Sequence, residues 1–293
     1  MKRLFLLCCC LAAAVPFSAR GESLERALRA VTDSVRATVG VAVVFGDGDT
    51  LAVNGGRCYP MLSVCKFHQA LAVLDRLDRR GLPLTTRIPV RRSDLLPGTW
   101  SPLREACPGG GRFTVAELLT YSVAQSDNNV CDVLFRFLGG TEAVDRYIAG
   151  LGIGETVIVA DEEMMHRHTD NQYLNRTTPL AAVRLLELFR RGELLSAAYG
   201  DFLLETMFAT ETGPDKLRGL LPADVAVAHK TGSSDRDGRG VKIADNDIGI
   251  VRLPDGRSYS IAVFVMDSRE DDRTNAAVIA RISRLVYDYA ARR

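Results

Sequence analysis

Apolar residues follow a helical or a strand period at both ends of the chain. Leucine and valine recur at helical spacing from Ser23 to Thr38, and a second helical pattern runs from Thr274 to Ala291. Four shorter apolar stretches, joined in pairs by turns rich in Gly, Asp and Pro, predict two β-hairpins. Their strands are residues 39–45 with 50–53 and residues 247–253 with 259–266.

The middle of the chain has mostly helical patterns. The predicted helices are residues 63–80, 115–125, 128–138, 142–150, 179–191 and 196–208. Because strands enclose this helical block, we predict a mixed α/β (α+β) fold, with an antiparallel sheet built from both chain ends and flanked by the terminal helices. The expected division is a sheet domain of residues 22–60 and 212–293 and an inserted all-helical domain of residues 61–211, with a small-molecule site in the cleft between them.

The first 21 residues have the composition of a signal peptide. A positively charged start precedes an apolar run from Leu4 to Val15 that is too short to span a bilayer, and small residues surround Gly21. We therefore predict export to the periplasm, cleavage near Gly21 and no stable membrane insertion afterwards. A lipid-anchored form through one of the cysteines at positions 8–10 is the alternative.

Charge and cysteine content limit which macromolecules, disulfides and metal ions are expected. The net charge is +1 and no basic run is interleaved with aromatics, so we expect no nucleic-acid partner. We also expect a monomer. Four cysteines follow the leader, namely Cys58, Cys65, Cys107 and Cys131. A disulfide between Cys65 and Cys131 is one expectation, and free buried thiols are the other. Neither cysteines nor histidines have the spacing of a zinc site, so no metal or other cofactor is expected.

Lysine is rare in this chain, and one lysine lies close to a serine. Only five of the 37 basic residues are lysines. Ser63 and Lys66 are three positions apart at the start of a predicted helix, so the amine can reach the hydroxyl on the same face. An amine that loses its proton in a desolvated pocket activates serine as a nucleophile. The alternative is a serine N-cap followed by a solvated lysine.

A second polar segment, Ser126-Asp127-Asn128, joins two predicted helices. All three residue types are favoured helix caps, so an ordinary capping segment is one interpretation. In the functional interpretation, the Ser126 hydroxyl relays a proton and the Asn128 amide binds a substrate carbonyl.

A third segment, Lys230 to Ser233, follows an apolar stretch that predicts a strand. Burying Lys230 near the centre of a sheet is costly without a partner, which favours a functional interpretation. Thr231 and Ser233 offer hydroxyls to a carboxylate, and Gly232 permits close backbone approach. The backbone N–H groups of Ser63 and Ser233 can then form an oxyanion hole.

Together, and in this order, the three segments resemble the Ser-x-x-Lys, Ser-Asp-Asn and Lys-Thr-Gly signatures of the penicillin-recognising serine enzymes. The resemblance covers essentially the whole mature chain and implies a β-lactamase/DD-peptidase-like fold. Within that superfamily, residues 160–166 are similar to the omega loop of class A β-lactamases. They fit the extended-spectrum subgroup, in which Glu-x-x-Met-His replaces the commoner Glu-x-x-Leu-Asn.

The resemblance assigns roles in this loop. Glu162 is the carboxylate that activates the hydrolytic water, without which an acyl-enzyme persists, and His166 stands in place of the usual water-holding asparagine. Glu163 is interpreted as an ordinary acidic loop residue. Class A enzymes usually have an Arg–Asp ion pair at the neck of the loop, where this chain has Ala160 and Asn175. Loop closure is therefore expected to depend on hydrogen bonds and packing.

The resemblance implies two further contacts with substrate. The usual arginine is not evident on the strand after Lys-Thr-Gly, so Lys216 is the candidate for binding the substrate carboxylate. Arg218 is the alternative, and a solvated pair of cations is the third possibility. Trp100, the only tryptophan, either stacks on a bound β-lactam at the cleft rim or anchors the core.

The function implied is that of a secreted class A β-lactamase that hydrolyses penicillins and cephalosporins and so gives antibiotic resistance. Ser63 attacks the lactam, Lys66 or Glu162 through a water takes its proton, and Ser126 protonates the departing nitrogen. One rival is a D-Ala-D-Ala peptidase or penicillin-binding protein, which lacks the deacylating glutamate. The other is a non-catalytic β-lactam sensor, which stays acylated.

Overall fold

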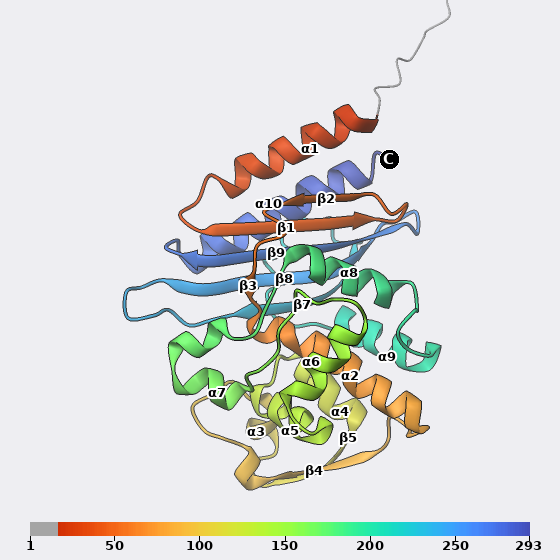
Figure 1. Ribbon diagram of the computed structural model, residues 1–293, viewed down its shortest axis with the longest axis vertical. Helices are drawn as coiled ribbons and strands as arrows, with labels where there is room; N and C mark the ends of the chain where they lie inside the picture. Colours follow the sequence, from red (N-terminus) through yellow and green to blue (C-terminus); the bar gives the residue numbers. More distant parts are fainter. Residues whose placement is uncertain (1–16) are drawn as a thin grey trace, which may run out of the picture.

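The computed structural model describes residues 17–293, and a five-stranded antiparallel sheet occupies its upper half in Figure 1. The strand order is β2-β1-β9-β8-β7. The strands are β1 (Thr38–Phe45), β2 (Thr50–Val53), β7 (Ala226–Ser233), β8 (Lys242–Arg252) and β9 (Ser258–Ser268). Strands from the two ends of the chain meet where β1 pairs with β9, from Thr38 opposite Met266 to Phe45 opposite Tyr259. The predicted sheet built from both chain ends is thereby confirmed.

Both faces of this sheet are covered, which explains the unbroken apolar run of β1. Val41 and Val43 face the terminal helices α1 (Phe17–Thr32) and α10 (Asp272–Ala290), which pack together on one side. Ala42 and Val44 face the opposite side, where α8 (Pro179–Arg190) lies against β1 and β9. A strand buried on both faces has no polar side to alternate with.

The first helix ends earlier than its pattern predicted. It stops at Thr32, and Thr38 already belongs to β1, so the prediction that the helix reaches Thr38 is wrong. The hydroxyls of Thr32 and Ser34 donate to the carbonyls of Arg29 and Val31, at 3.0 and 2.8 Å. Side chains that bond the last carbonyls of a helix compete with its continuation.

The helical layer below the sheet surrounds one central helix. Helix α2 (Cys65–Arg80) is buried along most of its length, including Phe67, Leu71, Leu74 and Leu77. The other helices of this layer are α4 (Val115–Leu119), α5 (Asn128–Leu138), α6 (Thr141–Gly150) and α9 (Ala197–Phe208). A helix whose first ten residues are all buried requires such surroundings. Whether this layer forms a separate domain stays a prediction.

Several short elements were absent from the predicted set. They are β3 (Tyr59–Pro60), η1 (Leu62–Val64), β4 (Arg87–Arg91), η2 (Arg92–Asp94), α3 (Pro102–Ala106), β5 (Gly110–Thr114), α7 (Glu162–Arg167), η4 (Thr169–Tyr173) and β6 (Arg176–Thr177). The pattern predicted one helix over residues 115–125, but its second half is a π-helical turn, η3 (Thr120–Ala124). Elements of two to six residues carry too few apolar positions to establish a period.

Two features bear on the predicted export. Most of the predicted signal peptide, including the cysteines at positions 8–10, lies outside the described residues, whose helices include none long and apolar enough to cross a membrane. Cys65 and Cys131 are buried and their thiols are hydrogen-bonded neighbours. The predicted disulfide between them is not formed, and the alternative of free buried thiols is the one observed.

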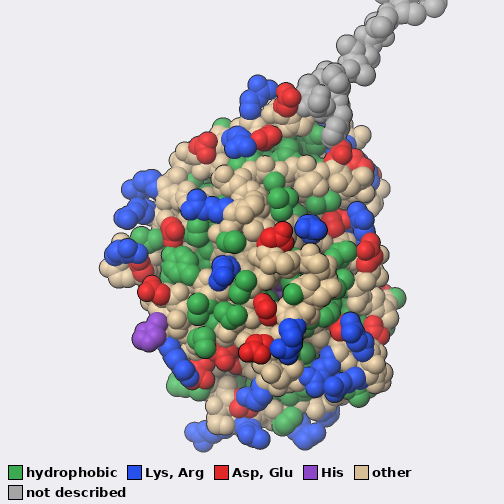
Figure 2. Space-filling view, viewed as in Figure 1, with side chains coloured by type: hydrophobic (Ala, Val, Ile, Leu, Met, Phe, Trp, Pro, Cys, Tyr) green, Lys and Arg blue, Asp and Glu red, His purple; other side chains and the backbone are tan. Residues whose placement is uncertain are grey.

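On the face seen in Figure 2, acidic and basic side chains are interspersed.

Candidate active site

Ser63 lies in the 3-10 turn η1 that leads into α2, and its side chain is paired with Lys66. The Lys66 side chain is fully buried, and its Nζ donates to Ser63 Oγ over 2.7 Å. No side chain caps the start of η1 or α2, so the alternative of a serine cap with a solvated lysine is wrong. Leu62 precedes the serine with φ of 48°, a conformation that costs energy in a leucine and that folded proteins retain mainly at functional sites.

The buried ammonium of Lys66 contacts three further acceptors, which come from α7 and from the start of α5. Its Nζ lies 2.7 Å from Glu162 Oε1, 2.6 Å from Asn128 Oδ1 and 3.2 Å from the Ser126 carbonyl oxygen. Burial alone lowers the pKa of Lys66, but the negative charge of Glu162 opposes it, and the net shift is upward from 10.5. Lys66 is therefore an ammonium in the resting site, and Glu162 is its ion-pair partner.

Ser126 and Asn128 face the cleft, whereas Asp127 between them caps a helix. Asp127 Oδ1 accepts from the Val130 N–H at 2.9 Å at the start of α5, so the capping interpretation holds for this one residue. Ser126 has φ of 60°, and Ser126 and Asn128 both line the same cavity as Ser63. The segment therefore combines a helix cap, Asp127, with two neighbouring residues that line the cavity, Ser126 and Asn128.

Lys230 is the second fully buried lysine of the site. Its Nζ donates to Ser126 Oγ at 2.9 Å and to the Thr231 carbonyl at 3.0 Å. Burial, followed by the positive charge of Lys66, lowers the pKa of Lys230 from 10.5 to about 7. Two lysines thus share one pocket with opposite shifts, because Lys66 has a carboxylate partner and Lys230 has only neutral acceptors.

Gly232 lets the edge strand β7 lie against the turn that carries Ser63. A Cβ at this position would collide with the Met61 carbonyl oxygen and lie 3.0 Å from the Val64 nitrogen and 3.2 Å from the Ser63 nitrogen. The absence of a side chain brings the backbone of Ser233 beside that of Ser63, as an oxyanion hole requires.

The short helix α7 is held on α5 by Asp132, which the sequence reasoning did not identify. Its carboxylate accepts from the N–H groups of Glu162 at 2.7 Å and Glu163 at 3.0 Å. Burial raises the pKa of Asp132 to about 7, and these two hydrogen bonds act in the opposite direction. Asp132 lies four residues after Asn128 and thus on the same face of α5, but no local pattern in the sequence connects it with Glu162.

The neck of this loop is closed by one asparagine. Asn175 Oδ1 accepts from the N–H groups of Val159 and Ala160 at 2.8 and 2.9 Å, and its Nδ2 donates to the Ala160 carbonyl at 2.7 Å. Asn175 is fully buried. The expectation that hydrogen bonds replace the usual ion pair at Ala160 and Asn175 is confirmed.

A chain of hydrogen bonds crosses from Asn128 to the loop. Asn128 Nδ2 donates to Thr99 Oγ1 at 2.7 Å, Thr99 Oγ1 lies 3.1 Å from His166 Nε2, and His166 Nδ1 lies 2.7 Å from the Glu162 carbonyl oxygen. A carbonyl oxygen can only accept, so Nδ1 donates to it and Nε2 faces the Thr99 hydroxyl. Both ring nitrogens of His166 are occupied by protein groups, which makes it a link between segments rather than a free ligand for water.

Two cavities, of about 440 and 420 Å³, open on Ser63. The first runs along β7 toward Lys216 and the start of α10, and the second lies beside Glu162 and His166. Thr231 lines the first cavity, and its Oγ1 is 2.6 Å from that of Thr212.

Trp100 lines both cavities and is 56% exposed. Its Nε1 donates to the Gln125 carbonyl at 2.8 Å, and its own carbonyl accepts from the Asn128 N–H at 3.0 Å. The alternative of a core anchor is therefore wrong, and the indole is available at the rim of the cleft.

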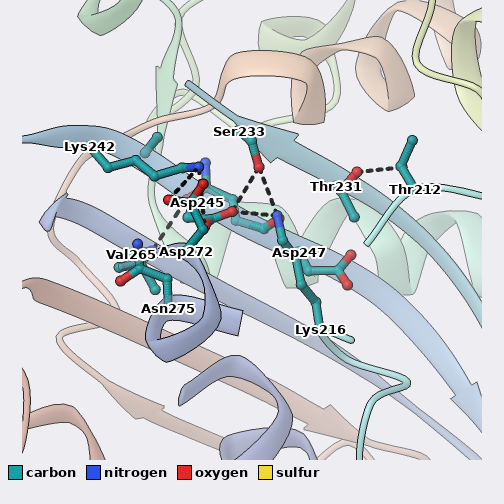
Figure 3. Close-up of polar contacts among 12 residues, drawn as sticks. Thr212, Lys216, Thr231, Ser233, Lys242, Asp245, Asp247, Val265, Asp272 and Asn275 are labelled. Carbon is teal, nitrogen blue, oxygen red and sulfur yellow. Dashed lines mark hydrogen bonds and ion pairs between the residues drawn. The ribbon is translucent and has the colours of Figure 1, made fainter. Parts of the chain in front are cut away.

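Lys216 is buried at the far end of the first cavity, whereas Arg218 is exposed outside it. Lys216 Nζ donates to Ser233 Oγ at 2.9 Å and forms an ion pair of 2.5 Å with Asp245 (Figure 3). The burial of Lys216 contradicts the interpretation of a solvated pair, and its contact with a substrate carboxylate stays a prediction. Among residues 17–293, no group of three or more His, Cys, Asp or Glu side chains is arranged to hold a metal ion.

Known proteins are similar to this chain in sequence and in fold. A model of the beta-lactamase enzyme family matches residues 23–290. A beta-lactamase of Bacteroides uniformis is 48% identical over 267 residues, which cover 90% of each chain. The extended-spectrum beta-lactamase PER-1 of Pseudomonas aeruginosa is 41% identical over 93% of this chain and 89% of its own. The crystal structure of TLA-3 extended-spectrum beta-lactamase superposes with a TM-score of 0.91, at 46% identity over 92% of this chain and 98% of that one.

The fold and the arrangement of serine, lysines and glutamate are those of a penicillin-recognising serine enzyme. The chain belongs to the beta-lactamase enzyme family, and within it to the class A serine β-lactamases.

Replacing Gly232 with alanine should destabilise the protein, since the added methyl group forces β7 away from the Ser63 turn. We expect the free energy of unfolding to fall by about 1–3 kcal/mol in urea denaturation. Gly238→Ala is the matched control, because a Cβ there meets nothing within 4 Å. Equal stability of the two variants would contradict the close approach.

The opposite pKa shifts of the two buried lysines, Lys66 and Lys230, can be tested by titration. In a 13C NMR titration we expect Lys230 to titrate near its pKa of about 7, and Lys66→Met to raise that pKa because a neighbouring positive charge is removed. Arg218→Gln, which removes an exposed positive charge, should leave it unchanged. A Lys230 signal that titrates at the ordinary lysine value in the wild type would disprove the assignment.

Proposed function

We propose that this chain hydrolyses the β-lactam amide of penicillins and cephalosporins through an acyl-enzyme on Ser63, and so gives antibiotic resistance. One observation carries the proposal: a single buried ammonium, Lys66 Nζ, lies 2.7 Å from both the Ser63 hydroxyl and the Glu162 carboxylate. The nucleophile and the group that must later activate water are thereby held around one proton carrier.

Substrate binding uses the edge strand and the rim of the cleft. The carboxylate of the β-lactam docks against Lys230, Thr231 and Ser233, with Lys216 behind them, and Asn128 contacts a carbonyl of the substrate side chain. Trp100 supplies an exposed ring on which the bound ligand stacks. The lactam carbonyl lies between the N–H groups of Ser63 and Ser233, which stabilise the oxyanion.

Acylation begins at the Glu162 carboxylate. Lys66 carries a proton in the resting site and becomes a base only after passing that proton to Glu162, 2.7 Å away. Alternatively, Glu162 removes the Ser63 proton through a water, and both routes leave a protonated Glu162. Ser126, which Lys230 contacts at 2.9 Å, then protonates the departing nitrogen. Lys66 returns a proton to Ser126 and recovers one from Glu162, so the Ser63 proton ends on the nitrogen and Glu162 is again a carboxylate before deacylation.

Deacylation needs a carboxylate that directs water onto the ester of Ser63. Glu162 is suited to this step because its backbone N–H is fixed by Asp132 and its carbonyl by His166, so its side chain starts from a defined position. General base catalysis of this kind contributes about 10²–10⁴ in rate. A peptidase or a sensor on the same scaffold would lack this base, and Glu162 therefore favours the hydrolase over both rivals.

The substrate range, location and assembly are parts of the same proposal. Similarity to PER-1 and TLA-3, both named extended-spectrum β-lactamases, supports the extended-spectrum subgroup. The signal-peptide composition of residues 1–21 supports secretion to the periplasm. We also propose that the protein acts as a monomer, that the cleft lies between a sheet domain and a helical domain, and that nucleic acid is not a partner.

The direct test is turnover of a chromogenic cephalosporin by the purified mature protein. We expect many turnovers for each protein molecule, unaffected by a metal chelator, because the proposed chemistry uses side chains alone. A single stoichiometric burst would instead identify the sensor, and the absence of any reaction would exclude both.

The Glu162→Ala variant should be acylated by a β-lactam but should release the product only slowly. Acylation of Ser63 persists at a reduced rate, while deacylation slows by at least about 100-fold, so an acyl-enzyme accumulates and is seen as a mass increase in the intact protein. Glu163→Ala is the matched control, because that side chain is half exposed and pairs with Arg167 on the surface. If both variants turn over at the wild-type rate, Glu162 is not the base.

A further inference from the structure

The end of the cleft that should receive the substrate carboxylate already contains a carboxylate. Asp245 is 2% exposed and lies opposite Ser233 in the register of β7 and β8. Its Oδ1 is 2.5 Å from Lys216 Nζ and accepts from Ser233 Oγ at 2.7 Å (Figure 3). The two groups best placed to bind an incoming anion are thus bound to an internal one.

Hydrogen-bond donors at this end are unequally available. Ser233 has one hydroxyl proton, which it donates to Asp245, and its oxygen accepts from Lys216 at 2.9 Å. Thr231 differs, because Thr212 can donate to it and leave the Thr231 proton for a ligand. When Thr212 is the donor, a substrate carboxylate can bind Thr231 directly, whereas Ser233 and Lys216 must first leave Asp245.

A second lysine restrains Asp245 from the other side. Lys242 Nζ lies 3.7 Å from Asp245 Oδ2 and 3.1 Å from Oδ1 of Asp272, whose side chain is 66% exposed (Figure 3). Two lysines and two aspartates together have no net charge. Because Asp245 and Lys216 are both buried, their attraction is screened much less than that of a surface pair.

We propose that Asp245 is a specificity-determining residue, which competes with the substrate carboxylate for Lys216 and Ser233 and so reduces the preference of the enzyme for anionic β-lactams. This inference rests on the proposed β-lactam hydrolysis. Its physical reason is repulsion between two carboxylates that need the same two donors. The wild-type enzyme then tolerates β-lactams in which this carboxylate is masked.

The test compares one β-lactam as its free acid and as its methyl ester. The measured quantity is the ratio of kcat/KM for the acid to kcat/KM for the ester, in the wild type and in Asp245→Asn. Asparagine keeps an Oδ1 that accepts from Ser233 and Lys216 but removes the negative charge. We expect the ratio to rise at least about tenfold in Asp245→Asn, mainly through a lower KM for the acid.

Asp272→Asn is the matched control. It removes a carboxylate from the same cluster, but one that is largely in solvent and contacts Lys242 and Arg236 instead of Lys216. Its acid-to-ester ratio should change less than about twofold, because exposed charge pairs are screened. A purely structural role of the cluster would instead affect acid and ester equally.

Removing the negative charge of Asp245 leaves the positive charges of Lys216 and Lys242 less well neutralised, which can prevent folding. A second variant therefore keeps the charges balanced. Asp245→Asn combined with Lys242→Gln removes one charge of each sign, and the same rise in the ratio is expected. In the wild type itself, the acid should be favoured over the ester by no more than about tenfold.

The outcomes separate the two proposals. If the wild type hydrolyses both lactams but strongly prefers the acid, or if the ratio stays constant or falls in the folded variants, the role of Asp245 is disproved and hydrolysis stands. If the wild type hydrolyses neither lactam, the proposed function itself fails.

Discussion

The site depends on the burial of one positive charge. An ammonium such as that of Lys66 is stable inside a protein only when oxygen atoms replace its water. Here the oxygens come from Ser63 on η1, Ser126 and Asn128 at the start of α5, and Glu162 on α7. The lysine therefore requires three distant parts of the sequence to converge. Any displacement of α7 would leave a buried charge without its main partner, so the charge and the loop hold each other in place.

Among residues 17–293, two of the four non-glycine residues with positive φ lie where the chain converges on Lys66. Leu62 and Ser126, adjacent to the nucleophile and within the second segment, both have positive φ, although neither is glycine. Such positions cost about 1–3 kcal/mol and persist only when their surroundings over-determine them. The glycine is used instead at position 232, where strand β7 approaches the Ser63 turn too closely for any side chain. Strain and close packing together align the catalytic groups before substrate arrives.

Sequence reasoning reached the parts of this structure that repeat a period or a motif. The sheet, the central helix α2 and the pairing of Ser63 with Lys66 followed from spacing, because 3.6-residue and two-residue periods translate directly into faces. Contacts that depend on a short loop did not follow. Nothing local to Asp132 or Thr99 shows that one fixes the Glu162 backbone and the other connects Asn128 with His166. The choice between Lys216 and Arg218 likewise required knowing which of two nearby side chains is buried.

Charge balance across the cleft gives the lysines different tasks. Lys66 is paired with Glu162, and Lys216 with Asp245. Among residues 17–293, no carboxylate forms an ion pair with Lys230, whose pKa of about 7 reflects burial next to another cation. Lys230 is consequently the lysine of the site that has no anion as its partner, and it lies beside Thr231, whose hydroxyl shares a hydrogen bond with that of Thr212. An anionic substrate that bound there would favour the charged form of Lys230 and raise its pKa, so binding the ligand and protonating its anchor are a single coupled event.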